Sequence, residues 1–341
     1  MSSSNLLMQY QSESLEALKS AAKISRPFEK VFMDTLKLFM AIPGKVNFLQ
    51  MGRYGEFSEQ TYRNNFANET FDWKSACHCR GSKLSPQVRK ENALDRKFWS
   101  GVAGEMKRGQ EIFGVGVIDV DNHDCMTLGA IQTPDTKSLE GMDHNLVEWY
   151  CQNLIILKER LQKISRLIVA DAFFSKETFV SPLLREGLHV ISRLRNDAVL
   201  FYPTIRKPTG KRGHPKWYDG KVDSSNLDLS RCEEAEVDKG RLFGLKAYSK
   251  SLKRFIKVAV CYPDEEDRTK WQIYFGTDDA MSAKDVIGCY RTRFRLEFCF
   301  RDGKHYAGLN GCQSTDLRKL EFHRNASFAS VNIAKAACKE L

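Results

Sequence analysis

The amino-acid sequence predicts an α/β protein whose sheet has mixed strand pairing. Three observations lead to this prediction. Between residues 110 and 200, apolar runs and helical patterns follow one another in the order strand, strand, helix, strand, helix, strand. Residues 201–278 carry further short strand-like runs in a stretch rich in Gly, Pro, Lys and Asp, which indicates a β-rich insertion. Residues 1–73 carry only helical patterns.

Composition places the chain among folded proteins that attract polyanions. Its 341 residues are 42% hydrophobic and 28% charged, and the net charge is +10. Nucleic acid is the commonest polyanion in a cell. The sequence shows no apolar run long enough for a membrane span and no secretory signal. The ten cysteines are scattered, and Cys77-His78-Cys79 lacks the spacing of a zinc site. We therefore expect a cytoplasmic protein that does not contact the membrane.

The N-terminal part is expected to be helical. Ser14 to Met40 has apolar residues at helical spacing, which Pro27 interrupts. The next stretch, from Gly44 to Phe66, mixes basic with aromatic residues on short helices. This mixture suits a DNA-contacting module, because basic groups bind phosphates and rings pack or stack. An ordinary helical subdomain with a solvated basic face is the alternative.

The central part is expected to form the mixed sheet. A turn at Asp121-Asn122-His123 separates two strand-like runs, and later strands and helices alternate. Ser175 is the expected N-cap of the helix that follows Asp171. The expected elements are strands at 111–120, 125–134, 166–171 and 189–195, helices at 143–163 and 175–188, and a long helix at 282–301.

Asp171 is a candidate metal ligand. It ends an apolar strand, RLIVAD, and carboxylates at such strand ends in α/β sheets are open to ligands. Mg²⁺ takes hard oxygen ligands and keeps positions for substrate phosphate oxygens. The alternative is a structural Asp that caps the following helix.

The long helix carries a second candidate group. Tyr290, Arg293, Glu297 and Lys304 fall within an arc of roughly 60° on one helix face, at 100° per residue. Arg301 lies on the same face, and Phe294, Leu296 and Phe298 are expected to pack against the sheet from the opposite one. A carboxylate between cations suits a site where a metal and DNA phosphates meet. A solvated face with i,i+4 ion pairs is the commoner use of such a stripe.

The spacing of these residues resembles a known signature. Tyr, two residues, Arg, three residues, Glu, six residues, Lys is the pattern of one large group of DDE transposases of bacterial insertion sequences. Tyr290, Arg293, Glu297 and Lys304 match it at every spacing. The segment LIVADAFFS resembles the one that holds the second catalytic Asp of this group. Further segments that look similar are FWSG (98–101), IQTPD (131–135), ISRLR (191–195) and FHRNAS (322–327).

The resemblance implies a ribonuclease-H-like core with two Mg²⁺ ions, for which Mn²⁺ can substitute, held by an Asp, Asp, Glu triad. Asp171 and Glu297 would be the catalytic metal ligands, and Tyr290, Arg293, Arg301 and Lys304 would bind DNA. The partners implied are double-stranded DNA, both insertion-sequence ends and target, and further copies of the chain on that DNA. The implied location is the bacterial cytoplasm, at the nucleoid when DNA is bound.

The resemblance also divides the chain. Residues 1–73 would bind DNA, 74–200 would start the catalytic core, 201–278 would be the insertion, and 279–341 would carry the catalytic helix and a tail that is truncated relative to the family. The motif at Lys211 to Lys216 resembles a minor-groove clamp with one Arg replaced by His, although an ordinary exposed turn is the commoner explanation of such a motif.

One element of the family pattern is missing. The first catalytic Asp should end a strand shortly before FWSG, but residues 74–97 contain no apolar strand, and their only Asp, Asp95, lies in a polar stretch. Back-translation of Cys77 to Leu94 with permitted codons, read one base forward, yields an apolar run that ends in Asp across Gly81 and Ser82. Two compensating frameshifts would account for the loss, and the coding DNA tests this hypothesis.

The sequence therefore leaves three functions open. The first is a transposase that cleaves and joins DNA at insertion-sequence ends, with activity reduced in this copy. The second is a DNA-binding relic without catalysis that competes for those ends, which the missing Asp favours. The third is an unrelated metal-dependent nuclease, which leaves the signature helix unexplained.

Overall fold

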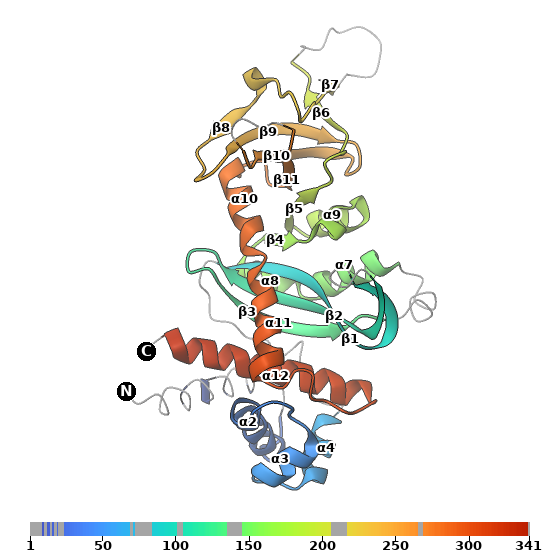
Figure 1. The fold of residues 1–341 in the computed structure, drawn as a ribbon, viewed down its shortest axis with the longest axis vertical. Helices are drawn as coiled ribbons and strands as arrows, with labels where there is room; N and C mark the ends of the chain where they lie inside the picture. Colours follow the sequence, from blue (N-terminus) through green and yellow to red (C-terminus); the bar gives the residue numbers. More distant parts are fainter. Residues whose placement is uncertain are drawn as a thin grey trace.

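The computed structural model describes residues 24–68, 71, 84–100, 105–134, 145–205, 217–264 and 269–339, and positions 9, 12, 13, 16 and 19 before them. For residues 84–100 and 105–110 it describes the backbone. The molecule is elongated, and three tiers follow one another along it (Figure 1). A helical bundle lies at one end, the first five strands lie in the middle, and the strands of 201–278 lie at the other end.

The described strands form one sheet in the order β3-β2-β1-β4-β5-β11-β10-β9-β6-β7, with β8 paired to β9. β1 is antiparallel to β2 and parallel to β4, and β4 is parallel to β5. This confirms the predicted α/β protein with mixed pairing. The bounds are β1 (Leu84–Ser100), β2 (Glu105–Asp119), β3 (Asp124–Gln132), β4 (Leu167–Ala170), β5 (His189–Leu194), β6 (Leu200–Pro203), β7 (Tyr218–Lys221), β8 (Glu233–Ala235), β9 (Arg241–Ser249), β10 (Arg254–Tyr262) and β11 (Gln272–Gly276).

The hairpin between β2 and β3 confirms the turn predicted at residues 121–123. Asp119 pairs with Asp124 across it, and His123 adopts a left-handed backbone with φ of 51°. The Asp119 carboxylate accepts hydrogen bonds from the backbone N–H and the side-chain amide of Asn122, at 3.1 and 2.7 Å. A short polar side chain that binds the nearby backbone is what makes such a turn favourable.

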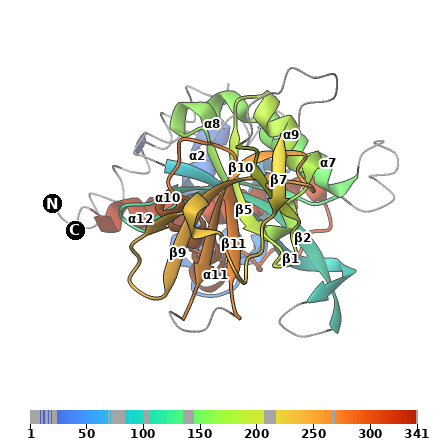
Figure 2. The ribbon, with the colours of Figure 1, turned by 90° about the horizontal axis from the view of Figure 1, so that it is seen from above.

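Helices cover both faces of the sheet, and side chains of each strand alternate between them. Ile168 and Ala170 of β4 pack with α7 (Leu146–Ile156), α8 (Lys158–Ile164) and α9 (Glu177–Arg185). Val169 packs on the opposite face with α10 (Ala283–Thr292). Figure 2 shows the first three helices along one side of the sheet and α11 (Arg295–Tyr306) on the other. Asp171, which follows β4, therefore emerges between two helical layers.

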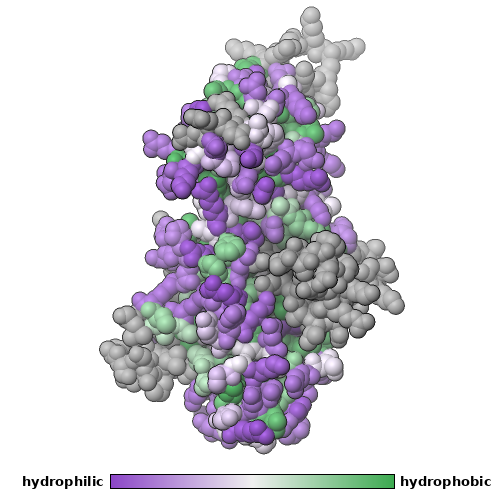
Figure 3. Space-filling view, in the orientation of Figure 1, coloured by the Kyte–Doolittle hydropathy of each residue, from purple (hydrophilic) through white to green (hydrophobic). Residues whose placement is uncertain are grey.

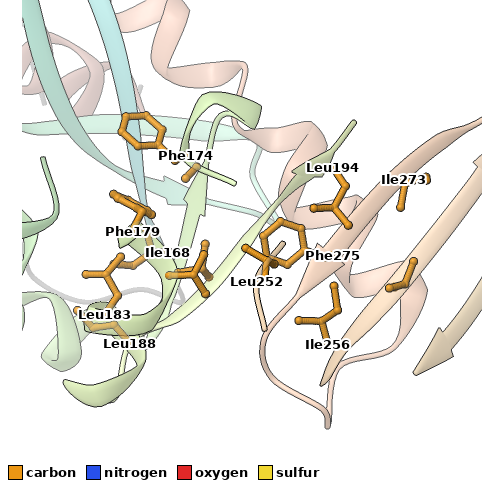
Figure 4. Packing of buried hydrophobic residues seen from close by; sticks show 14 of the residues in the cluster. Ile168, Phe174, Phe179, Leu183, Leu188, Leu194, Leu252, Ile256, Ile273 and Phe275 are labelled. Carbon is orange, nitrogen blue, oxygen red and sulfur yellow. The ribbon is translucent and has the colours of Figure 1, made fainter. Parts of the chain in front are cut away.

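The sheet and its core continue into residues 201–278. β11 pairs antiparallel with β5, with Ile273 opposite Leu194. One cluster of buried side chains extends from Ile168 and Leu183 to Ile256 and Phe275, and Figure 4 shows both parts of it. The strands of this segment are therefore a continuation of the sheet that carries Asp171, and they hold the position of β5 from its far side.

The sequence showed no apolar strand at residues 74–97, but the structure has a strand of polar composition in this part of the chain. β1 covers Leu84–Ser100 and lies between β2 and β4, bonded to β2 over most of its length and to β4 at Gln87 and Val88. Backbone pairing with these neighbours outweighs the polar composition. The missing Asp codon, at Gly81 and Ser82, and the Cys77-His78-Cys79 segment lie outside the described residues.

The helical bundle consists of α2 (Arg26–Ala41), α3 (Phe48–Tyr54) and α4 (Glu59–Phe66). The helical pattern is interrupted next to Pro27, as the sequence predicted, because residues 24 and 25 are not helical and α2 begins at Arg26 behind the N-cap Ser25, with Pro27 in its first turn. There the missing N–H of proline costs no hydrogen bond. Of the basic and aromatic residues expected to suit DNA contact, the aromatic residues Phe48, Tyr62 and Phe66 are buried, whereas Arg53 and Tyr54 are exposed.

The last helix, α12 (Leu317–Lys339), lies between the bundle and the sheet (Figure 1). Phe322 and Ala326 join the apolar cluster of the bundle, and Phe328 packs on Phe300 of α11. No helix among the described residues is long and apolar enough to cross a bilayer.

Two asparagines of α12 close the edge of the sheet. Asn325 accepts from the N–H of Ala130 at 2.9 Å and donates to the carbonyl of the same residue at 3.1 Å. Asn332, two helical turns later, makes the same pair of bonds to Thr127, at 3.0 and 2.8 Å. Since β3 is an edge strand, its outward backbone groups need partners, and these amides provide them.

His323 is fully enclosed beside these amides. Its Nε2 lies 2.8 Å from the carbonyl of Gly308, and burial lowers its pKa to about 4. The next residue, Arg324, donates to Gln132 at 3.2 Å, and burial lowers its pKa to about 10. The FHRNAS segment therefore joins α12 to β3 and to the loop that follows α11.

We expect Asn325→Ala to destabilise the protein by about 1–3 kcal/mol, because it leaves a buried N–H and a buried carbonyl of Ala130 without partners. Chemical denaturation measures the loss. Asn310→Ala, at an exposed asparagine, is the matched control and should change stability by less than about 0.5 kcal/mol. Equal stability of the two variants would contradict the assigned role.

We also expect the stability of the protein to decrease as the pH is lowered through a window set by His323. Its folded pKa of about 4 lies below the ordinary value of 6.5, so between these values the unfolded chain binds the proton and the folded chain does not. The free energy of unfolding should therefore decrease by about 2 kcal/mol from about pH 7 to about pH 5 on account of this residue. Denaturation of His323→Gln should show a flatter profile. The same slope in wild type and variant would contradict the prediction, and His305→Gln, at an exposed histidine, should leave the slope unchanged.

Candidate functional site

The site is formed where the predicted long helix breaks. Instead of one helix from Ser282 to Arg301, the structure has α10 and α11, with Arg293 as C-cap of the first and Phe294 as N-cap of the second. The expectation of one continuous face is therefore wrong. The Arg293 N–H still bonds to the carbonyl of Tyr290 at 3.2 Å, so the turn is tight and both helix ends face the same region.

Arg293 brings the two predicted metal ligands together. Its Nη1 lies 3.9 Å from Oδ2 of Asp171 and 3.8 Å from Oε1 of Glu297. The Arg293 side chain is 17% exposed, that of Glu297 is 24% exposed, and that of Asp171 is 45% exposed. A carboxylate after β4 and a carboxylate in the first turn of α11 thus share one cation at the rim of the sheet.

Tyr290 lies beneath the guanidinium. The Arg293 Cζ is 5.4 Å from the Tyr290 ring centre, and that ring packs against Tyr274 of β11 at 4.9 Å. Burial raises the pKa of the Tyr290 phenol and Asp171 raises it further, while Arg293 opposes both effects. The phenol therefore remains protonated at neutral pH and can donate a hydrogen bond.

Hydrogen bonds hold the backbone at Asp171. Its Oδ1 accepts from the N–H of Ala172 at 2.5 Å, as the N-cap of the short 3-10 helix η1 (Ala172–Phe174). The hydroxyl of Ser192 donates to the carbonyl of Asp171 at 3.0 Å. Asp171 has therefore the capping role that the sequence left as an alternative, and its Oδ2 faces Arg293 at the same time.

Ser175 is not the N-cap of α9, contrary to the sequence prediction. Lys176 occupies the cap position without a side-chain hydrogen bond. The Ser175 hydroxyl donates instead to the carbonyl of Arg193 at 2.6 Å and lies 2.9 Å from the hydroxyl of Ser192. It fastens the loop after Asp171 to β5, and it cannot cap α9 at the same time.

Arg301 and Lys304 lie further along α11. Arg301 is exposed, lies over the Phe298 ring at 4.5 Å and pairs with Asp302 at 3.2 Å. Lys304 is partly exposed. Arg301 and Lys304 therefore lie beyond the first turn of α11, which carries Glu297. The face that carries α10 and α11 is mainly hydrophilic (Figure 3).

The apolar side of α11 differs from the prediction. Leu296 is buried as expected, but Phe294 is 50% exposed and Phe298 is partly exposed. The helix break rotates α11, so Leu296, Cys299 and Phe300 pack on β2 and β3 in their place. Gly116 of β2 makes room for this approach, since a Cβ there would lie 2.7 Å from Leu296.

Asp171 and Glu297 offer carboxylate oxygens, the kind of ligand that Mg²⁺ takes together with waters and phosphate oxygens. Among the described residues no group of three His, Cys, Asp or Glu side chains could hold a metal, so the expected pair of ions has no complete ligand set there.

Asp119 cannot replace the missing ligand. It pairs with Leu84, four positions before Val88, the β1 residue that pairs with Ala170, and this separates it from Asp171 by more than about 13 Å along the strand. Its carboxylate is bonded to Asn122 and lies 4.0 Å from Lys339 of α12. Asp121 belongs to the same turn, which lies at the opposite end of the strand from Asp171.

Sequence reasoning missed two residues that shape the site. Ser192 positions Asp171 through its backbone, and Arg193, opposite Tyr274 in the β5–β11 register, partly opposes the burial that raises the pKa of both Tyr274 and Tyr290. The signal was present, because both lie in the ISRLR segment, which was given as a buried strand and as similar to a family segment without a role for either residue.

Comparison with models of protein families found no match, and neither did comparison with curated proteins.

Proposed function

We propose that the chain is by descent a DDE transposase, which binds the ends of an insertion sequence with the face of α10 and α11. One observation carries the proposal. Asp171 and Glu297 are far apart in the sequence, and they were selected independently, Glu297 by the signature spacing and Asp171 by its strand end and the LIVADAFFS segment. Both lie within 4 Å of one nitrogen of Arg293, a third member of the same signature.

The strand order supports the proposal. Three antiparallel strands followed by two parallel ones, in the order β3-β2-β1-β4-β5, is the arrangement of a ribonuclease-H-like core. In such a sheet Asp171, which follows β4, lies at the carboxyl end of a parallel strand, where α/β sheets bind ligands. The strands β6 to β11 would be the family's β-rich insertion.

The residues of this face have distinct tasks. Arg301 and Lys304 bind backbone phosphates and fix the position of the DNA without reading its sequence. The Tyr290 phenol donates a hydrogen bond to the bound strand beside Arg293. A bound Mg²⁺ would supply Lewis-acid activation of a phosphate. Asp171 and Glu297 would hold it, each oriented by its own element.

A second function is favoured by the described donors. Among the described side chains no third His, Cys, Asp or Glu joins Asp171 and Glu297 in a group that could hold a metal, so the described site has one negative charge fewer than an Asp, Asp, Glu triad. Such a site holds DNA phosphates better than it holds two cations. The chain would then occupy the element ends without cutting them and compete with an active relative.

The first prediction concerns DNA binding. Lys304→Ala should weaken binding of a duplex that carries the terminal sequences flanking the gene, and reduce the slope of log K against log salt by about 1, since one phosphate contact is lost. Fluorescence anisotropy at several salt concentrations measures both quantities. Lys158→Ala, at a lysine of α8 that pairs with Glu186 on the other sheet face, is the control. Wild-type protein that fails to bind DNA at low salt would refute the proposal.

The second prediction separates the two functions. We expect the wild type to bind the labelled duplex and to cleave it weakly or not at all in Mg²⁺, because the described donors form an incomplete triad. Glu297→Ala should remove any cleavage that remains, and Glu186→Ala, which breaks the remote pair with Lys158, should not. Efficient Glu297-dependent cleavage would favour the active transposase over the competitor.

A further inference from the structure

Arg293 occupies the position between Asp171 and Glu297 that a bridging cation would take. A single atom, Nη1, is the neighbour of both carboxylates, at 3.9 and 3.8 Å. Both distances exceed those of a hydrogen bond, so the contacts are Coulombic and lack the fork geometry of a bidentate pair. The guanidinium is therefore near both acids without being bonded tightly to either.

The rest of the side chain is enclosed but weakly anchored. It is 17% exposed, and its Nε is buried without a hydrogen bond among the described residues. The Tyr290 ring supports the guanidinium from below, at 5.4 Å. A buried guanidinium nitrogen without a partner raises the free energy of this conformation, so the arrangement gains from the guanidinium moving out to a phosphate.

Charge repulsion disfavours a guanidinium and a divalent cation that occupy this position together. Two carboxylates beside one guanidinium leave one negative charge, whereas two carboxylates beside a divalent cation leave none. A guanidinium that remained in contact with both acids would repel the incoming ion at short range.

We propose that Arg293 takes the place of the cation in the metal-free protein and competes with it for the two carboxylates, so that it sets the metal affinity of the site. This inference rests on the proposed function, because it takes Asp171 and Glu297 as the metal ligands. It adds that cation entry displaces Arg293 toward solvent, where DNA phosphates would bind it. Metal and DNA binding then favour the same arginine position and strengthen each other.

The test is a titration of the full chain with Mn²⁺ in the absence of DNA, in which calorimetry measures the affinity. Arg293→Gln should bind Mn²⁺ on the order of tenfold more tightly than wild type, because the competing charge is gone. Arg291→Gln removes the same charge from an exposed position two residues earlier and should change the affinity by less than about twofold. Arg293→Lys keeps the charge and should bind about as wild type does. Circular dichroism verifies that each variant is folded.

Two further results separate this inference from the proposed function. Glu297→Gln should lose Mn²⁺ binding, because one ligand is removed. If Glu297→Gln loses binding while Arg293→Gln equals wild type, the metal site stands and the competition is refuted. If Glu297→Gln binds as wild type does, or no variant binds Mn²⁺, the proposed site itself is refuted. Lys and Gln variants of equal, raised affinity would also overturn the inference, because charge would not be the cause.

Discussion

The arrangement of this protein depends on α12, because three otherwise separate parts pack on it. Its N-terminal half contributes Phe322 to the aromatic cluster of the helical bundle, and its middle contributes Phe328 to the contact with α11. Asn325 and Asn332 of the same helix bond to the edge of β3. Each amide satisfies one N–H and one carbonyl, so α12 holds the strand as a neighbouring strand would. The bundle, the sheet edge and α11 are thereby fixed relative to one another.

That arrangement determines where Glu297 lies. α11 is held between α12 and the β2–β3 hairpin, through Phe300, Leu296 and the gap left by Gly116. On the other side, β11 pairs with β5 and supports the strand from which Ser192 holds Asp171. The two carboxylates are thus held by different parts of the fold, Glu297 by the packing of α11 and Asp171 by β5. Arg293, at the helix break, lies close to both. The segment 201–278 has a structural role here, because without β11 the outer edge of β5 would lose its partner.

The sequence predicted the parts of this structure that depend on local pattern. Apolar runs located β2, β3, β4 and β5, and the polar turn at 121–123 located the hairpin. The signature spacing selected Arg293 and Glu297, and the end of an apolar strand selected Asp171; the structure brings the three together. It failed where pairing or packing overrides local pattern. β1 is a strand because β2 and β4 bond to it, and the helix breaks at Arg293 although its periodicity continues through Arg301. Ser175 has good N-cap chemistry but bonds to β5, a contact that no local pattern contains.

The position of α11 does not depend on the polar composition of β1, whose bonds to β2 and β4 are made by the backbone. Arg301 and Lys304, the residues proposed to bind phosphates, lie on α11, which is held by α12 and the β2–β3 hairpin. Under the proposed function, loss of one carboxylate would therefore affect cation binding far more than DNA binding. A transposase by descent would then keep its affinity for element ends after its chemistry had weakened.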